Sequence, residues 1–189
     1  MDTGEAVFQA PASLAGNYGT FTFNPTTGAW TYAADNAQSA VQSLGAGQTL
    51  TDSLTVKSLD GTATQAITVT ITGTNDVPVI GSGSGVSAGS VLEAGGVANA
   101  VVGTPNTGGT LSITDADQNQ SSFQAVAPAS LTGTYGSFTF NNATGVWTYA
   151  LDNSKAATQG LTAGQVVHDT LTVTSLDGTA TKAIDVTVT

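Results

Sequence analysis

The sequence contains no cysteine, no arginine, only three lysines and a single histidine. Without cysteine, neither a disulfide nor a thiolate metal site can form. Against the three lysines stand 13 acidic residues, which give a formal net charge of -10 at pH 7. A surface of this charge repels phosphate backbones and anionic lipid, so it argues against binding to nucleic acid or to a membrane surface. It suits a protein that takes up cations.

Long apolar runs are also missing. None approaches the roughly 18 residues of a membrane-spanning helix, so membrane insertion is not expected, and no signal peptide is visible. If the protein is exported, its export signal is expected to lie outside this sequence. Hydrophobic residues make up 40% of the chain, an ordinary share for a globular protein. A chain of 189 residues has room for one large domain or for two of about 100 residues each.

Internal repetition decides between these two possibilities. The segment Tyr18–Phe23 returns with one change as Tyr135–Phe140, and Asp52–Thr64 returns as Asp169–Thr181. The spacing between the copies is constant over these segments, and the second copy carries a two-residue insertion near Ala127. Matches of this length indicate two tandem repeats.

Within each copy, the local pattern is that of β-strands. Hydrophobic residues such as Phe21 and Phe23 alternate with Thr or Ser at a period of two, and turn residues such as those of 24–28 separate the runs. Only residues 36–44 and 153–161 are expected to form single helical turns. Strands at roughly ten-residue spacing predict an all-β protein made of tandem immunoglobulin-like or cadherin-like antiparallel β-sandwiches.

The two copies are not equally complete. The second copy begins with two additional strand candidates, residues 89–93 and 109–114, which have no counterpart in the first. The expected organisation is a first sandwich at 1–73 that lacks its initial two strands, a short acidic linker at 74–88, and a nearly complete sandwich at 89–189. The pattern leaves open whether strands 89–114 complete their own copy or the first one. The exposed edge makes a strand-swapped or edge-paired homo-oligomer plausible.

Several acidic residues are expected to meet at the junction between the copies. If the first strand of the second copy runs away from the junction, the next strand returns and brings Asp115 and Asp117 back beside Glu93. The hairpin tip at Asp177 must point the same way, and Asp76 immediately precedes the second copy. Carboxylates gathered in this way repel one another unless a cation binds, and several oxygen ligands suit Ca²⁺ better than Mg²⁺.

A second, weaker calcium site is expected at the far end of the first copy, at Asp2 and Asp60. Other acids have a simpler explanation, because Asp is favoured in turns, where its side chain bonds the nearby backbone. We expect this turn role for Asp35, Asp52, Asp152 and Asp169.

The residues of the second copy resemble the VCBS repeat of very large bacterial surface and biofilm adhesins. The resemblance is carried by Gly109–Asp117, Trp147–Asn153 and Asp177-Gly178, together with Val91–Glu93. It implies a repeat that occurs many times in series in secreted adhesins of the RTX type, where it acts as a spacer that Ca²⁺ makes rigid. The Asn75-Asp76-Val-Pro segment also looks like the cadherin linker, which adds Asn75 to the expected calcium ligands.

Two other functions are alternatives to the spacer. An enzyme is not expected, since the single histidine, His168, has no counterpart in the first copy and no nucleophile is identifiable beside it. A glycan-binding module would read carbohydrate through Trp30/Tyr32 and Trp147/Tyr149, which alternate with Thr and so share one face of a strand. Buried rings would favour the spacer, and exposed coplanar rings would favour the glycan reader.

Overall fold

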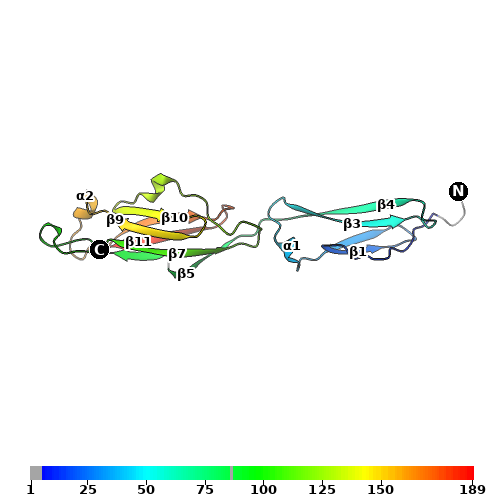
Figure 1. Cartoon of the computed structure of the whole chain (residues 1–189), viewed down its shortest axis with the longest axis horizontal. Coiled ribbons are helices and arrows are strands. Elements are labelled where there is room, and N and C mark those ends of the chain that lie inside the picture. Colours follow the sequence, from blue (N-terminus) through cyan, green and yellow to red (C-terminus); the bar gives the residue numbers. More distant parts are fainter. Residues whose placement is uncertain (1–5, 86) are drawn as a thin grey trace. The chain divides into compact units, whose positions relative to one another are not determined.

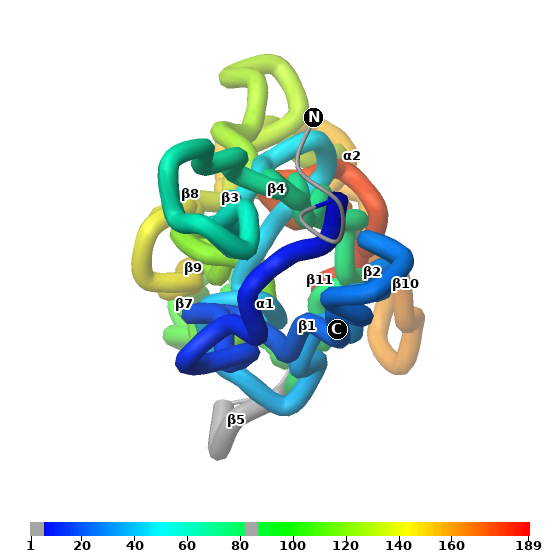
Figure 2. The backbone as a smooth tube through the Cα atoms, turned by 90° about the vertical axis from the view of Figure 1, so that its right-hand side faces the viewer, coloured from blue at the N-terminus to red at the C-terminus, as the bar shows by residue number. Residues whose placement is uncertain are grey.

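The computed structural model describes residues 6–85 and 87–189. The chain is all-β and divides into two compact units, Met1–Asp76 and Val77–Thr189, called unit 1 and unit 2 below. Figure 1 shows the elements of both units, and the backbone of each can be followed by its colour in Figure 2. The predicted β-sandwich class and the tandem arrangement of two related units are confirmed.

Unit 1 contains two antiparallel hairpins. Strands β1 (Gly19–Phe23) and β2 (Trp30–Ala34) form the first, and β3 (Thr49–Lys57) and β4 (Thr64–Thr72) form the second. A short helix, α1 (Ser39–Gln42), connects the hairpins. Its position confirms the helical turn expected between residues 36 and 44.

Unit 2 has a four-stranded sheet in the order β5-β7-β9-β8, antiparallel throughout. Its strands are β5 (Val79–Gly85), β7 (Asn106–Thr114), β9 (Val146–Leu151) and β8 (Gly136–Phe140). The second sheet has the order β10-β11-β6. Its strands are β10 (Val167–Thr174), β11 (Thr181–Val188) and β6 (Ala88–Val91), and β6 runs parallel to β11.

Three short helical segments complete unit 2. They are the 3₁₀ turns η1 (Val97–Asn99) and η2 (Pro128–Leu131) and the helix α2 (Ala156–Gln159). Helix α2 lies within the expected helical turn at 153–161, at the position that corresponds to α1 in unit 1.

The core of unit 2 lies between its two sheets. The largest side chains in it are Trp147 and Tyr149 from β9, which are both 1% exposed. Because alternate residues of a strand face the same side, β9 directs Trp147, Tyr149 and Leu151 inward and its threonine outward. Facing them across the sandwich are residues of β10 and β11 such as Leu171 and Ile184.

The chain path in unit 2 differs from expectation at its start. Residues 79–85 were expected to belong to a flexible linker, but they form strand β5, paired with β7 from Val79↔Thr114 onward. Val79 and Ile80 favour a strand, but the Gly and Ser residues that follow them do not mark one, since glycine has low β-propensity. The segment is a strand because β7 offers it an edge to pair with. The added strands β6 and β7 pair within unit 2, which answers the question of which copy they complete.

Unit 2 receives the chain at one end of its sandwich and releases it at the other. Strand β5 begins at Val79, which pairs with Thr114 at the end of β7. Strand β11 ends at Val188, which pairs with Val91 at the end of β6. We call the end with Val79 and Thr114 the entry pole and the end with Val91 and Val188 the exit pole.

Contacts at each end show that the two sheets share these poles. Near the exit pole, Leu92, just after β6, forms an isolated bridge with Thr104, just before β7. Near the entry pole, Ser175, just after β10, forms a bridge with Phe123 in the segment that follows β7. The turn between β10 and β11 therefore lies at the entry pole, beside the segment that leaves β7.

Candidate functional site

The acidic segment that follows β7 lies at the entry pole of unit 2. The amide of Asp117 donates to Oδ1 of Asp115 at 2.9 Å, and the amide of Asp115 donates to the hydroxyl of Ser121 at 3.0 Å. The backbone turns back at Asn119, whose φ of 65° lies in the left-handed region that asparagine tolerates. These bonds hold Asp115 and Asp117 in one tight loop.

The environment of this loop favours a cation. Asp117 is only 2% exposed. Oδ2 of Asp115 is buried, and none of the described residues donates a hydrogen bond to it. A buried carboxylate oxygen without a donor is costly, because it has lost its hydration. A bound cation or a water molecule would remove that cost, and oxygen ligands of this kind suit Ca²⁺.

Asp177 lies at the same pole, in the turn between β10 and β11. The amide of Leu176 donates to the carbonyl of Ser122 at 2.9 Å and so holds this turn against the segment that follows Asp117. The carboxylate of Asp177 accepts hydrogen bonds from the hydroxyl of Ser175 at 2.5 Å and from the hydroxyl of Thr179. Its oxygens therefore already stabilise the turn.

No three acidic or histidine residues within 6–85 and 87–189 lie close enough together to form a metal site by themselves. Unit 2 brings Asp115 and Asp117 into one loop and places Asp177 at the same pole. A complete calcium site there needs further oxygen ligands, such as backbone carbonyls or water.

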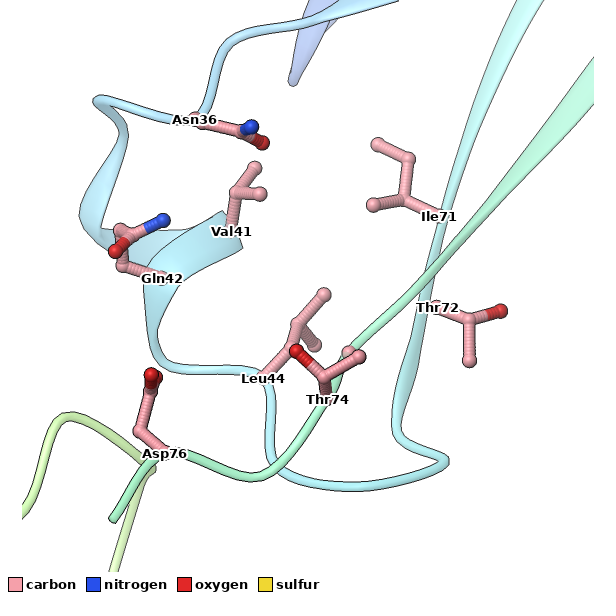
Figure 3. A pocket seen from close by; sticks show the side chains of 9 residues that line it. Asn36, Val41, Gln42, Leu44, Ile71, Thr72, Thr74 and Asp76 are labelled. Carbon is pink, nitrogen blue, oxygen red and sulfur yellow. The ribbon is translucent and has the colours of Figure 1, made fainter. Parts of the chain in front are cut away.

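Asn75 and Asp76 are the last two residues of unit 1. The side-chain amide of Asn75 donates to the carbonyl of Asp76 at 2.7 Å. The carboxylate of Asp76 also lines a pocket of about 190 Å³ at the end of unit 1, where it is turned toward α1, which carries Gln42 (Figure 3).

The structure does not bring Glu93 to the other predicted ligands. The sequence pattern places the start of the first strand near residue 89, but this strand starts at Val79, and β6 continues from it toward the exit pole. Glu93 follows β6, and its amide donates to the carbonyl of Thr189 at 2.8 Å. Its Oε1 accepts a hydrogen bond from Gln159 of α2 at 3.3 Å. Glu93 thus lies at the opposite pole from Asp115.

Of the two residues expected to form the weaker calcium site in unit 1, the structure describes Asp60. Asp2 lies outside the described residues. Asp60 occupies the turn between β3 and β4, as Asp177 does between β10 and β11. Hydrogen bonds from the hydroxyls of Ser58 (2.5 Å) and Thr62 (2.7 Å) lower the pKa of Asp60 from 3.8 to about 2. These hydrogen bonds give Asp60 a structural role within the turn.

Two buried aspartates have a role that the sequence reading missed. Asp52 in β3 and Asp169 in β10 were expected in turns, but they lie within strands and are 2% and 4% exposed. Asp169 accepts backbone N–H bonds from Thr134, Tyr135 and Gly136 at 2.8 to 3.1 Å. The phenol of Tyr149 donates a further bond at 2.7 Å.

Unit 1 repeats this arrangement around Asp52. The amides of Asn17 and Tyr18 donate at 2.7 and 2.9 Å, and the phenol of Tyr32 donates at 2.6 Å. Burial raises the pKa of the Tyr32 phenol to about 12, and its bond to Asp52 adds to that rise. A signal for this role was present in the sequence, because Asp52 shares the inward face of its strand with Leu54 and Val56.

The remaining two acids have the expected turn role. Oδ1 of Asp35 accepts the amide of Ala37 at 3.0 Å, just before α1. Oδ1 of Asp152 accepts the amide and the hydroxyl of Ser154 at 2.9 and 2.6 Å, just before α2. These hydrogen bonds lower the pKa of Asp152.

The aromatic pairs differ between the units. Trp147 and Tyr149 are core residues and cannot stack on a sugar. Trp30 is 44% exposed, whereas Tyr32 is half-buried and its ring lies 4.7 Å, centroid to centroid, from that of Phe21. The exposed coplanar pair that a glycan reader needs is therefore not formed in unit 2. His168, for its part, lies on the surface with Nδ1 3.0 Å from the carboxylate of Asp185.

Comparison with known proteins leaves the family of the chain open. No family model and no curated protein matches the sequence. Solved structures with a similar fold include the protocadherin GammaB4 extracellular domain, with 15% identity and a TM-score of 0.43 over 97% of this chain and 26% of that one. A second is PcdhgB3 EC1-4, with 12% identity and a TM-score of 0.35 over 91% of this chain and 38% of that one.

This chain therefore spans well under half the length of these two structures. Both TM-scores lie below 0.5, so the fold described above rests on the strand pairings of the chain itself. Among the described residues, no helix has both the length and the apolar character needed to span a membrane.

Proposed function

We propose that this chain is a structural extender module, a spacer, of a secreted bacterial surface adhesin that supports cell adhesion and biofilm formation. The observation that carries the proposal is the path of the chain through unit 2, which enters at one pole and leaves at the other. A unit with this path adds its length to the chain each time it is repeated. The assignment to a bacterial adhesin rests on the resemblance of its motifs to the VCBS repeat.

Calcium is the second part of the proposal. Asp115 and Asp117 bind Ca²⁺ at the entry pole, with Asn75 and Asp76 of the preceding segment and Asp177 of the neighbouring turn as further candidates. The buried Oδ2 of Asp115, to which none of the described residues donates, supports a cation at this position. We leave Glu93 out of this ligand set, because β6 carries it to the exit pole. The bound ion would restrain the segment that leads into unit 2 and so stiffen the chain.

Thermal unfolding with Ca²⁺ and with a chelator tests the calcium site. An ion that binds only the folded state stabilises it by about 2.7 kcal/mol when its concentration is 100 times Kd. We therefore expect Ca²⁺ to raise the unfolding midpoint of unit 2, and the Asp115→Asn/Asp117→Asn double variant to lose that rise. Asp185→Asn, which removes the partly exposed acid that faces His168 in the middle of β11, is the control and should keep the rise. An unchanged midpoint in the parent chain would rule the site out.

Small-angle X-ray scattering tests the extender role. The parent chain is measured with Ca²⁺ and with chelator, and the radius of gyration and the maximum dimension are compared. A spacer stiffened by Ca²⁺ should give a larger mean dimension and a narrower distribution of dimensions when the ion is bound. The Asp115→Asn/Asp117→Asn variant should give the chelator result under both conditions. A more compact chain with Ca²⁺ would contradict the spacer.

A further inference from the structure

Equivalent residues of the two units are buried to very different extents. Trp30 of β2 is 44% exposed, whereas its counterpart Trp147 of β9 is 1% exposed. Ile67 and Val69 of β4 are half-buried, whereas their counterparts Ile184 and Val186 of β11 are fully buried. The sequence repeat is close at these positions, so the difference arises from what covers them.

Strands β6 and β7 supply the cover in unit 2. Strand β7 pairs along β9, with Gly109 opposite Trp147, and β6 pairs along β11, with Val91 opposite Val188. Leu111 of β7 and Val91 of β6 are 1% and 2% exposed and belong to the core. In unit 1, β2 pairs with β1 and β4 pairs with β3, and no further described strand joins either hairpin.

Among the described residues, unit 1 therefore leaves open the edges of β2 and β4 that correspond to those covered by β7 and β6 in unit 2, and a half-exposed apolar face between its hairpins. We call this surface the open face, and its residues are Trp30, Tyr32, Ile67, Val69 and Ile71. The main-chain groups along a free edge can pair with an added strand, and the alternating side chains beside it provide pockets for that strand's own side chains.

We propose that the open face binds a polypeptide segment of the type that covers unit 2, with the sequence pattern of residues 79–114 and strands equivalent to β6 and β7. Unit 2 holds such a segment on nearly the same set of side chains, and so provides the template for the fit. The segment contains one acidic residue, Glu93, and no basic residue. Its approach to a chain of net charge -10 is therefore opposed by little repulsion.

The count of segments argues against an intact second copy as the occupant. Each copy of the chain has one 79–114 segment and two surfaces that fit it, on unit 1 and on unit 2. A second copy that donated its segment would uncover its own unit 2, including Trp147, so the exchange gains no burial. The occupant is therefore an additional segment of this repeat type that is not already held in its own sandwich.

The experiment adds a synthetic peptide of residues 77–116 to the intact chain and follows tryptophan fluorescence with iodide as quencher. Iodide reaches Trp30 but not Trp147, because only Trp30 is exposed. We expect the peptide to abolish the quenchable component and to form a one-to-one complex in native mass spectrometry. Hydrogen exchange should slow in 30–34 and 64–72, the two strands with open edges.

The control is the same peptide with Leu111→Asp, which places a charge where unit 2 buries Leu111. It should leave Trp30 quenchable and should not form the complex. The proposal is overturned if neither peptide binds, if both bind equally, or if protection appears only in the strands of unit 2. It is also overturned if Trp30 becomes protected with rising protein concentration alone, since a second copy would then be the occupant. None of these outcomes depends on Ca²⁺, so the result is independent of the calcium site.

Discussion

At the scale of the residue, the main constraint is a buried aspartate in each unit that holds a loop against a strand. Asp169 receives three backbone N–H bonds and the phenol of Tyr149. Gly133, close to these donors, has no room for a side chain, since a Cβ there would lie 2.2 Å from Oδ2 of Asp169. A buried carboxylate is tolerated because these donors replace its hydration.

Replacement of Asp169 by alanine should destabilise unit 2 strongly. The change leaves three backbone N–H groups and one phenol without their acceptor, and hydrogen bonds to a charged group contribute about 1.5–3 kcal/mol each. We expect the free energy of unfolding to fall by about 3 kcal/mol or more, measured by urea denaturation. Tyr149→Phe, which removes one donor, should cost about 1–2 kcal/mol. A loss below about 1 kcal/mol for Asp169→Ala would contradict this role.

The carboxyl of Asp60 should titrate at unusually low pH. Bonds from Ser58 and Thr62 lower its pKa to about 2, whereas its ordinary value is 3.8. A lowered pKa means that these bonds stabilise the fold above about pH 4 and are lost as the pH falls through 2. NMR titration of the side-chain carboxyl should give a midpoint near 2. Ser58→Ala should move this midpoint up, and Ser53→Ala, an exposed strand serine, should not. An equal midpoint in all three proteins would contradict the assignment.

At the scale of the element, the same hairpin turn has different neighbours in the two units. Gly28 and Gly145 both have positive φ, +73° and +70°. In unit 2 the turn packs against β7, and a Cβ on Gly145 would lie 2.0 Å from the carbonyl oxygen of Leu111. In unit 1 the nearest atom to a Cβ on Gly28 is on the ring of Phe8, at 3.0 Å. A comparison of alanine substitutions at Gly28 and Gly145 therefore separates the cost of backbone strain from the cost of disturbed strand packing.

Gly145→Ala should therefore cost more stability than Gly28→Ala. Both variants strain a left-handed backbone by about 1–2 kcal/mol. Gly145→Ala must also push β7 away from β9, so its total cost should be larger, and hydrogen exchange in β7 should become faster. Urea denaturation and hydrogen exchange of the two variants measure this difference. Equal costs would show that β7 does not pack closely on the turn.

At the scale of the whole molecule, the two units have unequal cores. Unit 2 has a single large cluster of fully buried side chains drawn from both sheets. Among the described residues of unit 1, the corresponding cluster has Phe21, Leu54 and Val56 as its buried members. Since burial of apolar area is the main source of stability, unit 1 should be the less stable of the two.

The chain should therefore unfold in two steps, unit 1 first. Denaturation followed by tryptophan fluorescence should show two transitions, because Trp30 reports on unit 1 and Trp147 on unit 2. Trp30→Phe should remove the fluorescence change of the first transition and leave the second. Calorimetry of the same proteins tests whether heating also produces two transitions. A single transition seen by every probe would show that the units unfold together.

The sequence by itself determined the class of fold and the repeat. Period-two alternation and turn residues are local, so they identified most strands, both helical turns and the related units. The same local rules explain why the turn roles of Asp35 and Asp152 were predicted correctly. The VCBS resemblance, the calcium site and the adhesin role remain proposals.

Only the tertiary structure decided three further points. Beyond Val79 and Ile80, strand β5 has no local signal, and it forms because β7 provides a partner. Glu93 lies at the exit pole because β6 pairs in parallel with β11, a register that no local pattern encodes. Trp30 and Trp147 share a sequence motif but differ in exposure, because burial depends on which distant strands cover a position. Strand pairing and burial by other strands both involve residues far apart in the chain. Short segments of the sequence therefore could not predict them.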